Sequence, residues 1–304
     1  MPEVFNKDIQ TFLSDIKSGE EIKQINAWTL AAQMDASVIE PLSDLLVAKE
    51  LPISKAADEA LKRITHSVGK TFSGDRWQSV VDAYIRVVER DHPAWAKAIA
   101  LRHLSMIAGD SAVNAAAKYL TDPELQEEAV YCLERIPGPA ATMALVDGLK
   151  KVSAEFEPRV LTALGHRKDP AAVEPVAAEM GSANVKVAIA AMKAAARIGV
   201  KPENEPELPD FESLSDRDKA AFVDSYLRFM DQQVKKGEML EDAMETFRGV
   251  LENAESEHFR CAAIVSLSKM GGAEAESLIQ AKVDNDSSYI VKITAKKALA
   301  CMKK

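Results

Sequence analysis

The histidines are the first residues to consider for chemistry, because an imidazole can bind a metal ion or move a proton near neutral pH. The chain has five, namely His66, His92, His103, His166 and His258. None belongs to a His-Glu-x-x-His pattern, and no two are four residues apart, the spacing that places two ligands on one helical face. His103 falls on a patterned helix and His166 in an expected turn. We interpret both as structural or exposed rather than catalytic.

Gly69-Lys70-Thr71 resembles the end of a phosphate-binding loop. Such a loop needs a glycine five residues earlier and a buried strand before it. Ile64 occupies that earlier position, and no strand pattern precedes it. We therefore expect a tolerated loop here rather than a nucleotide site.

The cysteines do not indicate a metal site or a disulfide. Cys132, Cys261 and Cys301 are far apart and lack Cys-x-x-Cys spacing. Each lies in an apolar helical pattern, which is typical of a buried structural thiol. Neither a Gly-x-Ser-x-Gly motif nor the glycines of a dinucleotide fold are present. The sequence thus predicts no catalytic residues, no metal and no cofactor.

The composition is that of a soluble helical protein. The 304 residues are 47% apolar, 28% charged and only 6% aromatic, and alanine is abundant. Small residues suit closely packed helices better than a sheet. No apolar run approaches the roughly 18 residues that span a membrane. The first residues form an amphipathic helical pattern rather than a signal peptide. We expect a cytoplasmic protein without a membrane partner.

A repeated pattern specifies how the helices are arranged. Small or apolar residues stand seven and three positions before an anchor residue, and alanine often follows five positions after it. The anchors are Met34, Ile64, Ile107, Ile136, Arg167, Ile198, Met270 and Met302. Most steps are close to 31 residues, which fits two short helices, a tight turn and a link. The pattern predicts an all-α solenoid of stacked helical hairpins.

Residues 129–149, AVYCLERIPGPAATMALVDGL, and 160–180, VLTALGHRKDPAAVEPVAAEM, resemble short HEAT repeats of phycobilisome-lyase-like proteins. The resemblance is strongest over 93–200, extends to 24–65 and 257–302, and is absent from 201–256. It implies an α-solenoid. It says little about function, because these repeats serve many roles.

Two steps depart from the period. One contains the polar stretch 65–75 before Trp77, and the other opens with VKPENEPELPDFESLSD, which predicts an extended linker. Helices over about 216–234 and 238–254 should follow, with Ser213 or Ser215 as a cap. Residues 201–257 hold sixteen acidic and seven basic residues, a net charge equal to that of the whole chain. This segment would attract a basic partner, or is simply a solvated helix pair.

The predicted organisation is an N-terminal array with a capping helix over 1–200, an acidic linker and longer hairpin over 201–256, and C-terminal repeats over 257–304. We expect these parts to form one continuous solenoid.

Enzymes with HEAT-like arrays offer alternatives. Deoxyhypusine hydroxylases bind two irons through His-Glu dipeptides, and this chain has none, so a di-iron site is not expected. Alkylpurine DNA glycosylases also use HEAT-like arrays, with a basic concave groove that carries aromatic residues. This array is neutral outside 201–257, so nucleic-acid binding is the third hypothesis for its function. Phycobilin lyases or isomerases need cations for two propionates and an apolar groove. Tyr84, Arg86, Lys118 and Tyr119 could supply part of that site, so bilin handling is the alternative function.

The leading hypothesis is a non-enzymatic interaction module that binds a protein or peptide on its concave face. We expect second helices to line that face. The candidate binding residues are Trp77, Asp82, Arg86, Asn114, Lys118, Lys150 and Glu174. Trp77 is either an interface anchor or a staple that packs the preceding loop onto the array.

Overall fold

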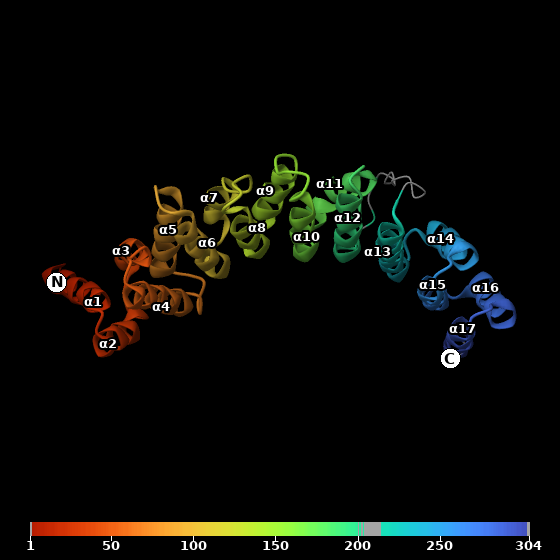
Figure 1. Ribbon diagram of the computed structural model, residues 1–304, viewed down its shortest axis with the longest axis horizontal. Coiled ribbons are helices and arrows are strands. Elements are labelled where there is room, and N and C mark those ends of the chain that lie inside the picture. Colours follow the sequence, from red (N-terminus) through yellow and green to blue (C-terminus); the bar gives the residue numbers. More distant parts are fainter. Residues whose placement is uncertain (1, 200, 202, 204–213, 303–304) are drawn as a thin grey trace. The chain divides into compact units, whose positions relative to one another are not determined.

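The computed structural model describes residues 2–199, 201, 203 and 214–302, with side chains from Asp8 onward (Figure 1). Within these ranges the regular structure is helical and contains no strand. The chain divides into two compact units, Met1–Ser153 and Ala154–Lys304. The domain boundaries predicted above come from breaks in the repeat pattern, whereas these units are defined by contacts, so the predicted boundaries stay a prediction.

Unit 1 is a two-layer stack of helical hairpins. Its first helices are α2 (Glu21–Ala31), α4 (Leu51–Val68), α6 (Ala94–Ile107) and α8 (Gln126–Arg135). Its second helices are α3 (Ile39–Leu46), α5 (Asp75–Glu89), α7 (Val113–Ala117) and α9 (Pro139–Leu149), and α1 (Pro2–Lys17) precedes them. Each first helix packs on the next first helix, and each second helix on the next second helix. This stacking is that of an α-solenoid.

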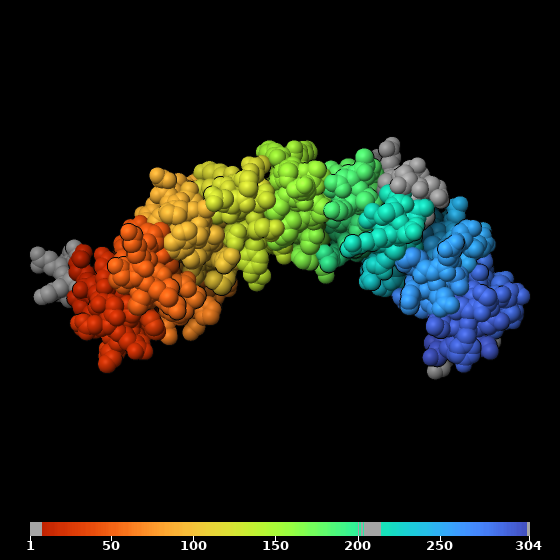
Figure 2. All heavy atoms as spheres, viewed as in Figure 1, coloured from red at the N-terminus to blue at the C-terminus, as the bar shows by residue number. Residues whose placement is uncertain are grey.

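Unit 2 has the same kind of construction. One layer contains α10 (Glu157–Arg167), α12 (Val185–Ile198), α13 (Asp216–Lys236), α15 (Glu257–Met270) and α17 (Tyr289–Met302), each packed on the next. The other helices are α11 (Val173–Ala178), α14 (Leu240–Asn253) and α16 (Gly272–Asn285). In Figure 2, neighbouring segments of each unit follow one another in chain order, as nearest-neighbour packing requires.

The predicted longer hairpin is present as α13 and α14. Ser215 caps α13, since its hydroxyl accepts a hydrogen bond from the Asp218 amide at 3.3 Å. Gly237 ends α13 with a left-handed backbone (φ 75°). Since α13 packs between α12 and α15, it takes a first-helix position, and α14 follows as its second helix. Most of the predicted linker, and Ser213, lie outside the described residues.

The repeat anchors mark the ends of first helices. Ile107, Arg167, Ile198, Met270 and Met302 are the last residues of α6, α10, α12, α15 and α17. Small residues recur just before them because the helices approach closely. A Cβ added to Gly165 of α10 would lie 2.7 Å from the Cα of Ala194 in α12. The Ala-rich composition is thus a requirement of the packing.

Helix α4 is longer than the sequence predicts. The polar stretch was expected to begin at Thr65, but α4 extends to Val68 and the loop covers only 69–74. Thr65 is fully buried because its hydroxyl is satisfied inside the core. It lies 2.8 Å from the Tyr84 hydroxyl and 3.0 Å from His103 Nδ1.

Two further expectations change. His166 lies in the last turn of α10 rather than in a turn between helices, because the left-handed residue that ends the helix is Lys168 (φ 55°). Cys132 is buried as predicted, whereas Cys261 is half-buried and Cys301 is exposed near the end of α17. A helical pattern alone does not fix how far a side chain on that helix is exposed. None of the helices in the described part of the chain combines the length and apolar character needed to cross a bilayer.

Candidate functional site

A groove of about 540 Å³ lies on the second-helix layer of unit 1, between α7 and α9. Small or flexible apolar residues form its floor, and polar residues surround them. The apolar lining is Val113, Ala117, Leu120, Ala140, Met143 and Ala144, and the polar lining is Asp110, Asn114, Lys118, Thr121, Asp147 and Lys151. Two aspartates and two lysines balance the charge. The groove therefore offers apolar contact together with hydrogen-bonding groups of both kinds.

The sequence creates this groove by placing small side chains where the two helices face each other. Helix α7 has only five residues, and Ala117 and Ala144 do not fill the space between it and α9. Gly148 allows α9 to approach the end of α7, since a Cβ there would lie 2.5 Å from the Cδ1 of Leu120. The opening is thus bounded by a close helix contact at one end.

Two of the predicted binding residues line this groove. Asn114 and Lys118 are exposed and lie four residues apart, on α7 and just after it. The Nζ of Lys118 is 2.5 Å from the Glu89 carboxylate, which raises the pKa of Lys118. Asn114 presents an amide that can both donate to and accept from a peptide group.

The predicted residues on α5 are engaged within the protein. Trp77 is half-buried, and its indole Nε1 donates to the Ile107 carbonyl at 2.8 Å, as a staple between α5 and the end of α6 would. Asp82 accepts a hydrogen bond from Gln78 at 2.8 Å. Arg86 is exposed but pairs with the Glu40 carboxylate at 2.7 Å.

The two remaining predicted residues lie elsewhere. Lys150 is exposed after the last turn of α9, and its neighbour Lys151 lines the groove instead. Glu174 is on α11 in unit 2, where its carboxylate accepts from the Glu203 amide at 2.6 Å.

Sequence reasoning missed Met143 and Asp147, although a signal for them exists. Asn114 stands seven positions after the anchor Ile107, and Met143 stands seven positions after the anchor Ile136. Lys118 and Asp147 occupy the equivalent positions eleven after those anchors. Extending the register by one repeat would have found both residues.

The residues suggested for a bilin do not form a free binding surface. Tyr84 is fully buried in the core, where its hydroxyl bonds Thr65, so it cannot contact a ligand. The Tyr119 hydroxyl donates to the Val88 carbonyl at 2.7 Å, and Lys97 approaches it at 3.1 Å. Tyr84 is a candidate from the sequence because it lies on an expected second helix, and the sequence does not reveal the buried Thr65 that bonds its hydroxyl.

The groups with the largest pKa shifts lie in the core rather than along this groove. Burial lowers the pKa of His103 to about 4 and raises that of Cys132 to about 12. Helix α4 ends at Val68 and α5 begins only at Asp75, so Gly69-Lys70-Thr71 does not open a helix as a phosphate loop would. Across the described ranges, no three His, Cys, Asp or Glu side chains gather where they could hold a metal ion.

The comparisons with known proteins give only distant similarity. No family model and no curated protein matches the chain. Among solved structures, the chain is similar to human deoxyhypusine hydroxylase in complex with glycerol, at 18% identity and a TM-score of 0.38, covering 75% of this chain and 97% of that one. It is also similar to an engineered protein, at 20% identity and a TM-score of 0.40, covering 97% and 88% of the two chains. Because both TM-scores are low, the fold assignment depends on the helix packing within each unit.

Proposed function

We propose that the chain is a non-enzymatic interaction module and that unit 1 binds a segment of a partner protein in the groove between α7 and α9. The observation that carries this proposal is the lining of that groove. It combines an apolar floor, which includes the exposed Met143, with the polar side chains of Asn114, Lys118, Asp147 and Lys151.

These groups suit a polypeptide. An apolar side chain of the partner would cover Ala117 and Ala144, and the flexible thioether of Met143 adapts to its shape. The Asn114 amide would form hydrogen bonds with the partner backbone. Because the rim carries both signs of charge, it would fix where charged side chains of the partner lie rather than favour a partner of one net charge.

The proposal is tested by affinity capture from the native host with four matched baits. Two variants alter the groove. Ala144→Phe fills it, and Lys151→Glu reverses one rim charge. Lys55→Glu is the charge-matched control, since Lys55 is exposed on α4 in the first-helix layer. Wild type and Lys55→Glu should retain the same protein, and both groove variants should lose it while keeping the wild-type circular dichroism and Tm. Equal retention by all four folded baits would refute the α7–α9 site.

A further inference from the structure

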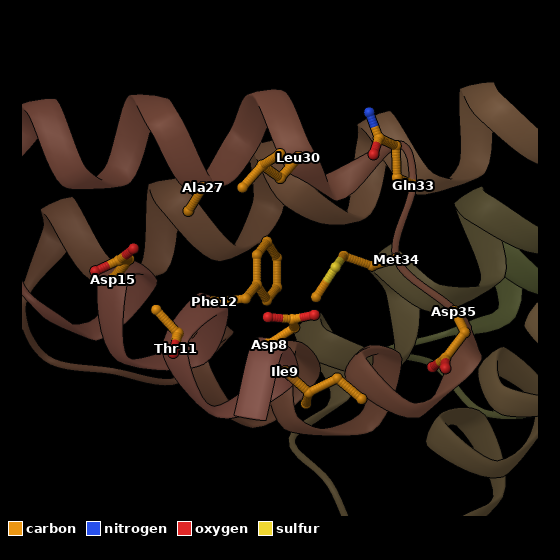
Figure 3. Close-up of a pocket in the computed structure, with 10 residues that line it drawn as sticks. All are labelled: Asp8, Ile9, Thr11, Phe12, Asp15, Ala27, Leu30, Gln33, Met34 and Asp35. Atoms are coloured by element: carbon orange, nitrogen blue, oxygen red, sulfur yellow. The ribbon is translucent and has the colours of Figure 1, made fainter. Parts of the chain in front are cut away.

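A second groove, of about 390 Å³, lies between α1 and α2 in unit 1. Phe12 and Ala27 form its floor and are almost completely buried. Figure 3 shows the Phe12 ring between Leu30 and Met34, with Ile9 at one edge. The volume falls within the range of clefts that bind ligands.

The apolar walls of this groove are not fully covered by the protein. Ala27 and Ala31 form the face of α2 that is buried in the unit, and α2 packs on both α1 and α4. Leu30 is 52% exposed although it stands between these alanines in sequence. Met34 follows the helix and is half-buried. These two side chains can close on an inserted apolar group at little cost, because the thioether adjusts its rotamer readily.

Among the described residues, the charged side chains that line the groove are all of one sign. Asp8, Asp15 and Asp35 line it, and no lysine or arginine does so among the residues that the structure describes. Asp35 is partly occupied, since its carboxylate accepts hydrogen bonds from the Ser37 amide and hydroxyl. No side-chain hydrogen bond or ion pair among the described residues engages the carboxylates of Asp8 and Asp15, although the charge of Asp15 contributes to the raised pKa of Lys23, which does not line the groove.

The two unpaired carboxylates also have a defined spacing. They stand seven residues apart on α1, which places them on one helical face about 10 Å apart along the axis. Phe12 lies between them in sequence and turns toward the space between α1 and α2 (Figure 3). An occupant must therefore present an apolar group flanked by two cationic groups.

We propose that this groove binds a basic amphipathic helix of a partner protein. A leucine-like side chain enters between Phe12, Leu30 and Met34, and lysine or arginine residues about two turns apart on the partner pair with Asp8 and Asp15. Such a helix repeats the helix-in-groove mode of peptide recognition. The carboxylates repel nucleic acid and anionic lipid, so charge complementarity selects a basic polypeptide. This inference does not depend on the α7–α9 groove, which has a balanced rim.

The test uses the full chain and a fluorescent synthetic helical peptide that carries leucine with lysine three residues before and four residues after it. A control peptide has glutamate in place of each lysine. Fluorescence anisotropy should show saturable binding of the lysine peptide and no binding of the glutamate peptide. Equal binding of the two peptides would overturn the proposal.

Matched protein variants separate the groove from the general negative charge of the chain. Asp8→Lys with Asp15→Lys should weaken binding at least tenfold, because each attraction becomes a repulsion. Asp91→Lys with Glu124→Lys changes the net charge equally at exposed positions outside the groove. This control should bind within about twofold of wild type. Comparable weakening by both pairs would contradict the site.

A third variant tests the apolar part. Leu30→Gln leaves the charges intact and alters a half-exposed side chain, so the unit should keep its wild-type Tm. We expect at least threefold weaker binding of the lysine peptide. Wild-type affinity of Leu30→Gln would overturn the insertion of an apolar anchor. If the double lysine variant fails to fold, Asp8→Asn with Asp15→Asn replaces it, and wild-type affinity in that variant would equally refute the proposal.

Discussion

The buried cluster of Thr65, Tyr84 and His103 should make unit 1 sensitive to acid. Tyr84 stacks on the His103 ring with centroids 5.0 Å apart, and Thr65 joins the two side chains by hydrogen bonds. His103 is 3% exposed. Burial is the largest cause that lowers its pKa from the ordinary value of 6.5 to about 4. The imidazole is therefore held neutral in the folded protein.

The direction of the pH effect follows from proton binding. Between pH 6.5 and 4 the unfolded chain binds a proton at His103 that the folded chain does not bind. The contribution of neutral His103 to the free energy of unfolding is therefore fully present above pH 6.5, and it is lost as the pH is lowered toward 4. The free energy of unfolding should decrease by about 3 kcal/mol in total from this residue.

Urea unfolding at pH 7 and at pH 4 measures the effect, in wild type and in His103→Gln. Tryptophan fluorescence is a suitable probe because Trp28, Trp77 and Trp95 all lie in unit 1. The variant should be less stable than wild type at pH 7 but should lose less stability on acidification.

Thr65→Val is the control. It removes the hydroxyl that bonds the ring, keeps His103 buried, and should retain the wild-type dependence on pH. Parallel losses of stability in wild type and His103→Gln between pH 7 and 4 would refute the argument.

Four further results are expected, three in unit 2 and one among the cysteines. Gln233→Leu should raise the free energy of unfolding by about 1–2 kcal/mol, because neither amide atom of this buried side chain has a hydrogen-bond partner; a loss of stability in urea would contradict this. Gly165→Ala should lower the free energy of unfolding by about 1–3 kcal/mol, and with it Tm, because the added Cβ would press on Ala194 of α12. Gly249→Ala, which meets open space within α14, should add about 0.5–1 kcal/mol, and equal shifts in the two variants would be inconsistent with the packing. In native protein a thiol reagent should modify Cys301 first and Cys132 only on unfolding, as peptide mapping by mass spectrometry would show.

The repeat pattern predicted most of the fold because it records the packing directly. The small residues before Arg167 and Ile198 are present because α10 and α12 nearly touch, so their spacing carries the architecture. The length of α4 was not predictable in the same way. Thr65 reads as the start of a polar loop until Tyr84 and His103, which lie far along the sequence, are seen to satisfy its hydroxyl.

The candidate site was predicted in part. Asn114 and Lys118 were found because they occupy outward positions of a second helix, and their equivalents Met143 and Asp147 follow the same register. Trp77 is a candidate anchor because it is a large aromatic residue just after the polar stretch, at the start of an expected second helix. Its hydrogen bond to the Ile107 carbonyl is a tertiary contact with no sequence signature. The groove between α1 and α2 could not be predicted from the sequence either, because it depends on the distance between α1 and the side chains of Leu30 and Met34.

Site-specific photo-crosslinking tests the central claim, that unit 1 binds a polypeptide between α7 and α9, most directly. A photoreactive amino acid replaces Met143 in the groove, and a control replaces Lys55 on α4. On illumination in the native host, the Met143 position should give one discrete protein adduct that is lost when Ala144→Phe is added. The Lys55 position should not give this adduct. The same adducts from both positions, or an adduct at Met143 that persists with the groove filled, would contradict the account.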